Sequence, residues 1–330
     1  MKIKKSLYFT AAFFILIFSA ILSISAGAVE IPLQDVLNVF LGKGTEINKT
    51  IIFSLRLPRL IVSAFVGMGL SVVGTFFQGL LRNPMADPYI LGVSSGAAFG
   101  ATIAIILNLG IFGLSFMAFL SALLTVFFVY TISKTGTRVS MTTMLLAGIA
   151  VSAFISAIIS LMMLLNHDQF SRIVFWTMGG FGLVTWNNVY VSAPIITVGS
   201  FVMYLFSRDV NAILTGEESA EHLGVNTEFV KKLILAIGSL VTALSVSVGG
   251  IIGFVGLIVP HIARLIIGPD NRYLVPFSGI LGAVFLILAD LFARVLLKPM
   301  EIPIGIITAA FGGPFFLYLL VRSKQKSERM

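Results

Sequence analysis

The sequence lacks cysteine altogether and is poor in charge: none of its 330 residues is cysteine, and only 11% are Asp, Glu, Lys or Arg. The absence of cysteine excludes disulfides, thiolate catalysis, zinc–thiolate sites and iron–sulfur clusters. A soluble globular protein has about 25% charged residues, whereas this chain is 58% hydrophobic and has a mean hydropathy of +1.04. The composition therefore excludes an ordinary soluble enzyme and indicates a membrane protein.

The sequence also lacks the motifs of nucleotide and metal sites. It has no G-x-x-x-x-G-K-[ST] loop, and Gly42-Lys43-Gly44 does not have that spacing. The three histidines, His167, His222 and His261, share no helical face at metal-ligand spacing. We therefore expect no cofactor on this chain, and any ATP hydrolysis that its function requires is expected on another chain.

Long apolar runs dominate what is present. A helix needs about 20 apolar residues to span a bilayer. Nine apolar runs are long enough to cross, at 7–29, 58–81, 89–107, 112–132, 141–165, 189–207, 231–250, 275–297 and 303–321. A tenth run, 251–267, is irregular because Gly253, Gly256 and Pro260 interrupt it. We predict an all-α polytopic membrane protein with about ten transmembrane helices, in one domain over residues 1–330.

The first apolar run imitates a signal peptide, because lysines precede it and Ala26-Gly27-Ala28 follows as a small-residue cleavage site. A signal h-region has about 7–15 residues, whereas residues 7–29 are long enough to span fully. Retention as the first helix is therefore favoured over cleavage. The amino terminus would then be cytoplasmic.

The basic residues support this topology. With ten spans starting inside, 15 of the 22 Lys and Arg residues lie in inside segments and 7 lie outside, which is the asymmetry of the positive-inside rule. Both termini are predicted to be cytoplasmic, in a multi-pass protein of the cytoplasmic (inner or plasma) membrane. Topology explains most of the net charge of +8, so nucleic-acid binding is not expected.

Two similar stretches indicate an internal duplication. Leu70-Ser71-Val72 ahead of Gly79-Leu80-Leu81 resembles Leu244-Ser245-Val246 ahead of Gly256-Leu257-Ile258. Repeated halves with Gly- or Pro-interrupted helices are typical of transporters. We predict two structurally related halves, although short apolar matches also arise by chance.

The longest inside loop, 208–229, contains the pattern of a capping box, with Thr215 at the N-cap and Glu218 three residues later. Gly224 suits the left-handed position after a helix end. A helix of two turns is marginal alone, so a partner would hold it; the alternative is an ordinary connector. The predicted segment consists of Thr215, Gly216, Glu217, Glu218, Ser219, Ala220, Glu221, His222, Leu223 and Gly224.

Charges near the outer membrane surface have two interpretations each. Asp290 and Arg294 are four residues apart near the end of a span, which favours an ion pair over a proton relay. Arg56 and Arg59 lie outside, where lipid head groups or a docking protein would supply acidic partners. In the preceding loop, 28–57, an apolar stripe predicts an interfacial amphipathic helix with Leu33, Val36, Leu37, Phe40 and Leu41.

A tight inside turn, residues 82–88, contains Asn83, Pro84, Asp87 and Pro88. The small residues that follow, 92–98, favour close helix packing over contact with a ligand.

Seven motifs occur in order, nearly without gaps, from about Arg56 to Arg322. They are Arg56-Leu57-Pro58-Arg59; Gln78 with Arg82-Asn83-Pro84-Met85-Ala86-Asp87-Pro88; Leu91-Gly92-Val93-Ser94-Ser95-Gly96-Ala97; Gly253-Phe254-Val255-Gly256-Leu257-Ile258-Val259-Pro260-His261-Ile262-Ala263-Arg264; Leu288-Ala289-Asp290 with Arg294; Glu301-Ile302-Pro303-Ile304-Gly305; and Gly313-Pro314-Phe315-Phe316. Together they resemble the FecCD family of ABC-importer permeases.

This resemblance implies a permease subunit that forms a homodimer around a central path. It also implies an extracytoplasmic substrate-binding protein and two ATPase subunits, which hold ATP and Mg. The substrates of the family are metal chelates, namely iron-siderophores, haem or cobalamin. The segment 176–182 with Trp186 resembles cobalamin permeases slightly more than the others.

The resemblance also assigns roles to single residues. Thr215 to Val225 resembles the coupling helix that fits a groove on the ATPase. Arg56, Arg59 and Arg294 resemble arginines that dock the binding protein. Residues at the expected cytoplasmic gate are Met141, Thr142 and Thr143, and residues of the structural motifs are Asn83, Pro84, Asp87, Pro88, Pro260, His261, Arg264 and Asp290.

Two other classes of protein fit the sequence less well. An ion-coupled secondary transporter would need several acidic residues inside its spans, and only Asp290 qualifies. An intramembrane enzyme would need a convergent catalytic set within the bilayer, and the sequence shows none.

Overall fold

The computed structural model describes residues 2–327 apart from 28, 84, 136–137 and 140. Within these residues, seven helices are long and apolar enough to cross a membrane. They are α1 (Lys2–Ser25), the continuous helix of α3 (Glu46–Thr50), η1 (Ile51–Arg56) and α4 (Leu57–Leu80), then α6 (Gly110–Ser133), α7 (Met141–Leu165), α9 (Trp186–Leu205), α12 (Thr227–Gly249) and α14 (Asn271–Val295).

Three further apolar helices are α5 (Val93–Ile106), α13 (Val255–Ile267) and α15 (Ile304–Ser327). All ten predicted segments are therefore helical. α5 has 14 residues, or about 21 Å of helix, which is shorter than the hydrocarbon core of about 30 Å. The predicted all-α polytopic fold is confirmed, whereas the internal duplication stays a prediction.

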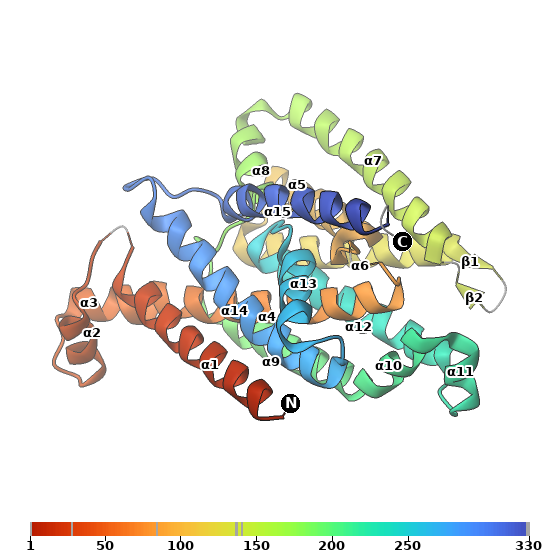
Figure 1. Cartoon of the computed structure of the whole chain (residues 1–330). Coiled ribbons are helices and arrows are strands. Elements are labelled where there is room, and N and C mark those ends of the chain that lie inside the picture. Colours follow the sequence, from red (N-terminus) through yellow and green to blue (C-terminus); the bar gives the residue numbers. More distant parts are fainter. Residues whose placement is uncertain (1, 28, 84, 136–137, 140, 328–330) are drawn as a thin grey trace.

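Short elements connect these helices at two opposite ends of the molecule. α2 and α3 lie at one end, and α10, α11 and the β1–β2 hairpin lie at the other (Figure 1). The bounds are α2 (Leu33–Phe40), η2 (Pro88–Leu91), β1 (Lys134–Thr135), β2 (Arg138–Val139), η3 (His167–Gln169), α8 (Phe170–Thr177), α10 (Ser207–Thr215) and α11 (Glu217–His222).

α4 forms the centre of the bundle and is buried along most of its length. α4 comes so close to α14 and α13 at two points that only glycine, which has no side chain, fits there. A Cβ on Gly67 would lie 2.2 Å from the carbonyl oxygen of Gly282, and one on Gly74 would lie 1.9 Å from that of Gly256. Such close approach is how helices gain packing energy in lipid, where no hydrophobic force drives them together.

The small residues after the inside turn pack α5 against α6, as predicted. A Cβ on Gly96 would meet Thr125 Oγ1 at 2.3 Å, and one on Gly100 would meet the Met117 carbonyl at 2.1 Å. At these positions α5 therefore contacts α6, which agrees with helix packing and not with the alternative of ligand contact.

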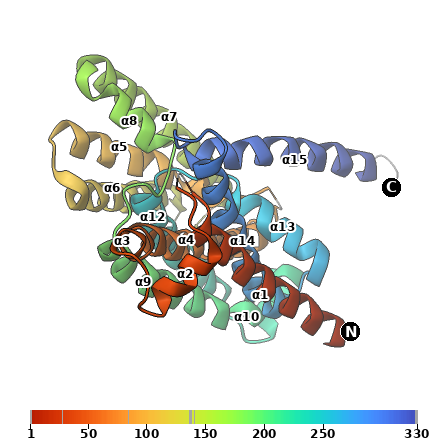
Figure 2. The ribbon, with the colours of Figure 1, turned by 90° about the vertical axis from the view of Figure 1, so that its left-hand side faces the viewer.

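The outer helices are less covered by the rest of the chain. α7 exposes large apolar side chains such as Leu146 and Phe154, and α15 projects from the bundle towards the C-terminus (Figure 2). The predicted amphipathic helix is α2, in which Val36 is buried while Leu33, Leu37 and Phe40 are about half exposed. Apart from Val36, its apolar stripe therefore faces away from the protein core.

Candidate functional site

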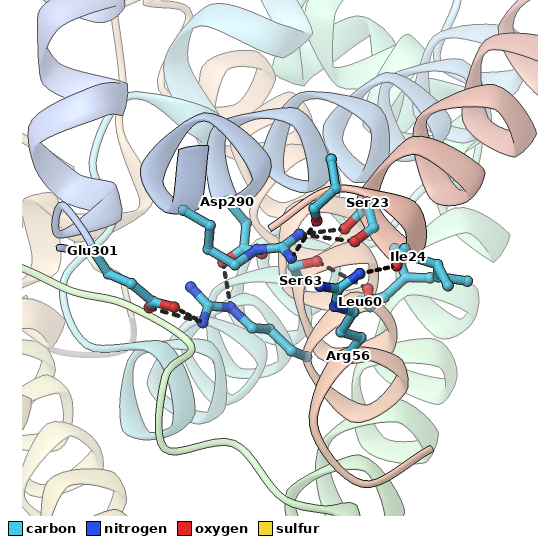
Figure 3. Close-up of polar contacts among 10 residues, drawn as sticks. Ser23, Ile24, Arg56, Leu60, Ser63, Asp290 and Glu301 are labelled. Carbon is cyan, nitrogen blue, oxygen red and sulfur yellow. Dashed lines mark hydrogen bonds and ion pairs between the residues drawn. The ribbon is translucent and has the colours of Figure 1, made fainter. Parts of the chain in front are cut away.

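Five charged residues near the end of the bundle that carries α2 and α3 form what we term the arginine cluster: Arg56, Arg59, Arg294, Asp290 and Glu301. Asp290 is buried and accepts bonds from two guanidinium groups. Arg59 Nε lies 2.8 Å from Asp290 Oδ1, and Arg294 Nε lies 3.0 Å from Oδ2. Arg59 Nη1 also lies 2.9 Å from Glu301 Oε2 (Figure 3). The predicted Asp290–Arg294 ion pair is confirmed.

The other donors of the cluster hold the end of α1. Arg56 donates to the carbonyls of Ile24, Ser25 and Val29, and Arg294 donates to Ser23 and Ala26 (Figure 3). The last carbonyls of a helix have no partner within it, and they carry the negative end of its dipole. Two guanidinium groups therefore cap α1.

This geometry changes the expectation for the three arginines. They were expected to face outward and to meet acids on another protein, yet Arg56 and Arg294 are only 7% and 5% exposed. Their partners lie within the chain, because the carbonyls at the end of α1 lie beside Arg56 and Arg294, and Asp290 lies between Arg59 and Arg294. The docking role stays a prediction, and it now concerns groups that already have partners.

A cavity of about 410 Å³ adjoins the cluster. Arg59 and Glu301 form part of its wall, together with residues 179–183 between α8 and α9. The end of α12 supplies Ser247, Val248, Gly249 and Gly250. A neighbouring pocket of about 260 Å³ is lined by Arg56, Arg59, Arg294 and Glu301.

Backbone hydrogen bonds link the segments at this end of the bundle. Gly180 N–H donates to the Gly249 carbonyl at 2.7 Å, and Ile304 N–H donates to the Gly179 carbonyl at 2.9 Å. Gly250 has a φ of +68°, and a Cβ there would lie 2.4 Å from the Trp176 carbonyl. The segment between α8 and α9 is thereby joined to both α12 and α15.

At the opposite end, the loop 208–229 contains two helices, and the predicted capping box is wrong. Thr215 is the last residue of α10, and its hydroxyl donates to the Ala212 carbonyl at 2.8 Å. Gly216, with a φ of +145°, precedes α11 instead. Thr215 cannot cap α11 because a preceding helix, which the sequence reading missed, already uses it.

The predicted end of this helix is confirmed. Gly224 has a φ of +84°, its N–H donates to the Glu221 carbonyl, and Val225 N–H donates to the Ala220 carbonyl. This is the Schellman pattern. Between the two glycines, α11 exposes Glu218, Glu221, His222 and Leu223, and Leu223 is 75% exposed.

α10 and α11 are attached to three transmembrane helices. Arg82 donates to the Ile213 carbonyl at 3.0 Å, which joins α10 to the end of α4. Asn211 Nδ2 donates to Asp270 at 2.8 Å, next to the start of α14. Lys231 Nζ of α12 lies 2.5 Å from Glu217 Oε2 of α11. Sequence reasoning missed Lys231, because its charge alone only indicates an inside position.

Gln78 compensates for a proline inside α13. Pro260 has no N–H to donate to the carbonyl of Gly256 four residues earlier. Gln78 Nε2 donates to the Gly256 and Leu257 carbonyls at 3.3 and 3.0 Å, and its Oε1 accepts from Arg264 at 3.0 Å. The proline signals that a partner is needed, but the sequence does not reveal that α4 supplies it.

The remaining motif residues have structural contacts. Asn83 Oδ1 accepts from Met85 N–H, and Asp87 Oδ1 accepts from Tyr89 N–H at 2.8 Å. The ring of His261 in α13 meets that of Phe315 in α15, with centroids 6.2 Å apart. Pro88 is buried at the start of η2, and Pro84 lies outside the described residues.

Met141, Thr142 and Thr143 form the first turn of α7, directly after the β1–β2 hairpin. Both threonines are exposed, and their gating role stays a prediction. Among the residues that the structure describes, no three His, Asp or Glu side chains gather as metal ligands.

The model of the FecCD transport family matches residues 15–322. An uncharacterized ABC transporter permease of Bacillus subtilis (strain 168), YvrB, is 41% identical, over 92% of this chain and 90% of that protein. The cobalamin import system permease BtuC of Halobacterium salinarum is 44% identical, over 83% of this chain and 74% of that protein. A solved ABC transporter described as of the metal-chelate type, in an inward-facing conformation, superposes with a TM-score of 0.87 and 30% identity, over 96% of this chain and 99% of that one.

Proposed function

Because the chain belongs to the FecCD transport family, we propose that it is the permease subunit of an ABC importer for a metal chelate. It is a multi-pass membrane protein with ten apolar helices among its described residues. The carrying observation is the close superposition on a transporter of the metal-chelate type. This chain binds and moves the chelate and breaks no bond in it.

The proposed assembly has two copies of this chain, two ATPase subunits and one extracytoplasmic binding protein. ATP and Mg bind the ATPase subunits. The exposed side of α11 supports the ATPase contact, because Leu223, directly after α11, offers an exposed apolar anchor next to the acidic Glu218 and Glu221, and an anchored helix can enter a groove.

The pocket beside the arginine cluster supports binding-protein docking. An acidic side chain that enters it would meet Arg59, whose side chain is 12% exposed and paired with the partly exposed Glu301. The carboxylate would then compete with Glu301 for the same guanidinium group. Charge pairing of this kind mainly sets orientation and encounter rate.

The cargo is proposed from the relatives. The cobalamin permease of Halobacterium salinarum is similar over most of this chain, and cobalamin and haem are favoured slightly over iron-siderophores. The superposition on a transporter in an inward-facing conformation supports an inward-facing state.

The test is co-purification of the tagged chain with the products of neighbouring genes, followed by an ATPase assay in proteoliposomes. Binding proteins loaded with cobalamin, haem or a ferric siderophore are added in turn. A stoichiometric ATPase partner and stimulation by one loaded binding protein are expected. Transport driven by an ion gradient without ATP would contradict the proposal.

A further inference from the structure

Lys231 is a charged residue that the bundle buries. It lies in the second turn of α12, and its side chain is 11% exposed, whereas that of the adjacent Lys232 is 40% exposed. Its Nζ lies 2.5 Å from Glu217 Oε2 of α11 and 3.6 Å from Glu228 Oε1 of α12 itself. Removing a charged side chain from water is costly unless it is paired. The pair therefore fixes where Glu217 sits relative to α12.

α11 is short and has a glycine at each end, so its position depends on contacts with other helices. It has six residues, and it lies between Gly216, with a φ of +145°, and Gly224, with a φ of +84°. Glycine permits backbone conformations that other residues rarely adopt. Glu217 is the first residue of α11, directly after Gly216, so its ion pair restrains the start of the helix.

A second contact restrains the other end of α11. Thr227 Oγ1, at the start of α12, donates to Glu221 Oε1 at 2.8 Å, and Ala220 between the two contacts is buried. Both side-chain contacts are with α12. A displacement of α11 is therefore passed to α12 through these two side-chain contacts, and not only along the backbone through Gly216 and Gly224.

α12 leads from this point to the cavity. Its 23 residues span about 35 Å, and its last residues, Ser247 to Gly249, line the 410 Å³ cavity. The Gly249 carbonyl accepts from Gly180, in the segment between α8 and α9 that forms another part of the cavity wall. One continuous helix thus joins α11 to the wall of the cavity.

We propose that Lys231 is a positioning residue for transport: its ion pair with Glu217 makes α11 and α12 move as one body. Movement imposed on α11 is then carried along α12 to Ser247, Val248 and Gly249, which line the cavity at the other end of that helix. This inference rests on the proposed function, in which an ATPase subunit binds α11.

The experiment measures uptake and ATP hydrolysis together in proteoliposomes that hold the full complex. K231Q removes the charge, K231R keeps it, and K232Q is the matched control one residue away on the exposed side. For K231Q we expect substrate moved per ATP to fall about fivefold or more, while the ATPase still co-purifies. K231R and K232Q should keep the wild-type ratio.

The absence of cysteine provides a second variant. E217C/K231C should be uncoupled in reducing buffer, and a bifunctional thiol reagent that spans the two positions should restore the ratio. A structural role alone would lower assembly and both rates together and would not respond to the reagent.

The outcomes separate the two claims. If wild type recruits no ATPase, the proposed function fails. If wild type couples and K231Q couples equally well, only the role of Lys231 is overturned. Should K231Q fail to accumulate, E217Q breaks the same pair from its half-exposed partner, and a wild-type ratio there overturns the inference as well.

Discussion

Asp290 holds the arginine cluster together, since its two oxygens pair with Arg59 and Arg294 and its side chain is 1% exposed. D290N would leave two guanidinium groups without their main counter-charge, and breaking a buried pair costs about 3–5 kcal/mol. Glu301 is 43% exposed, so E301Q should cost about 1 kcal/mol or less. Thermal unfolding in detergent measures both, and equal losses would show that burial is not the cause.

Asp87 should make stability depend on pH. Burial raises the pKa of its carboxyl to about 6, against a hydrogen bond from Tyr89 N–H that lowers it. The native state therefore binds more protons than the unfolded state between about pH 4 and 6, and stability falls as the pH rises through that window. D87N keeps an oxygen for Tyr89 N–H and removes the charge.

D87N should thus be more stable than wild type at pH 7.5, by at most about 3 kcal/mol, and the difference should shrink as the pH falls and vanish near about pH 3, below the unfolded pKa. Unfolding temperatures across this range measure the difference. A constant offset at all pH values would contradict the role of the Asp87 charge.

Local spacing foretold one contact of the arginine cluster. Asp290 and Arg294 are four residues apart on a helix, and that distance is readable from the sequence. The partners of Arg56 are backbone carbonyls that lie 27 to 32 residues earlier in the chain. Every residue has a carbonyl, so no residue type could mark these as the acceptors.

At the scale of helices, glycine contacts should decide the packing of α4. G74A would place a Cβ 1.9 Å from the Gly256 carbonyl of α13, whereas at Gly79 the nearest atom belongs to Val210 at 3.5 Å. Overpacking costs about 1–3 kcal/mol, while alanine is favoured over glycine in a helix by about 1 kcal/mol. G74A should lower the unfolding temperature, and G79A, as its control, should leave it unchanged or raise it.

The length of the apolar runs made the positions of the helices predictable, but the sequence did not show which helices pack against each other. The run 251–267 was recognised as irregular from its glycines and proline, and it is the short α13. The loop 208–229 shows the limit. α10 and α11 have only nine and six residues, so neither forms a long apolar run, and the N-cap of α11 was placed one residue too early, at Thr215 and not at Gly216.

At the scale of the whole molecule, the orientation in the membrane can be mapped because the chain has no cysteine. S6C, at the start of α1, and K43C, after α2, are both exposed positions. A thiol reagent that does not cross membranes should label K43C in intact cells and S6C only after permeabilisation. The reverse pattern would overturn the predicted cytoplasmic amino terminus.

The cap on α1 has a consequence in time. Arg294 and Ser23, which are joined by a hydrogen bond, are 271 positions apart in the chain. Ribosomes add roughly 5–20 residues per second. Arg294 is therefore made roughly 14 to 54 seconds after Ser23. Arg56 follows its acceptors Ile24, Ser25 and Val29 by only 27 to 32 residues, so during synthesis it can reach the end of α1 first, and Arg294 completes the cap once α14 has been made.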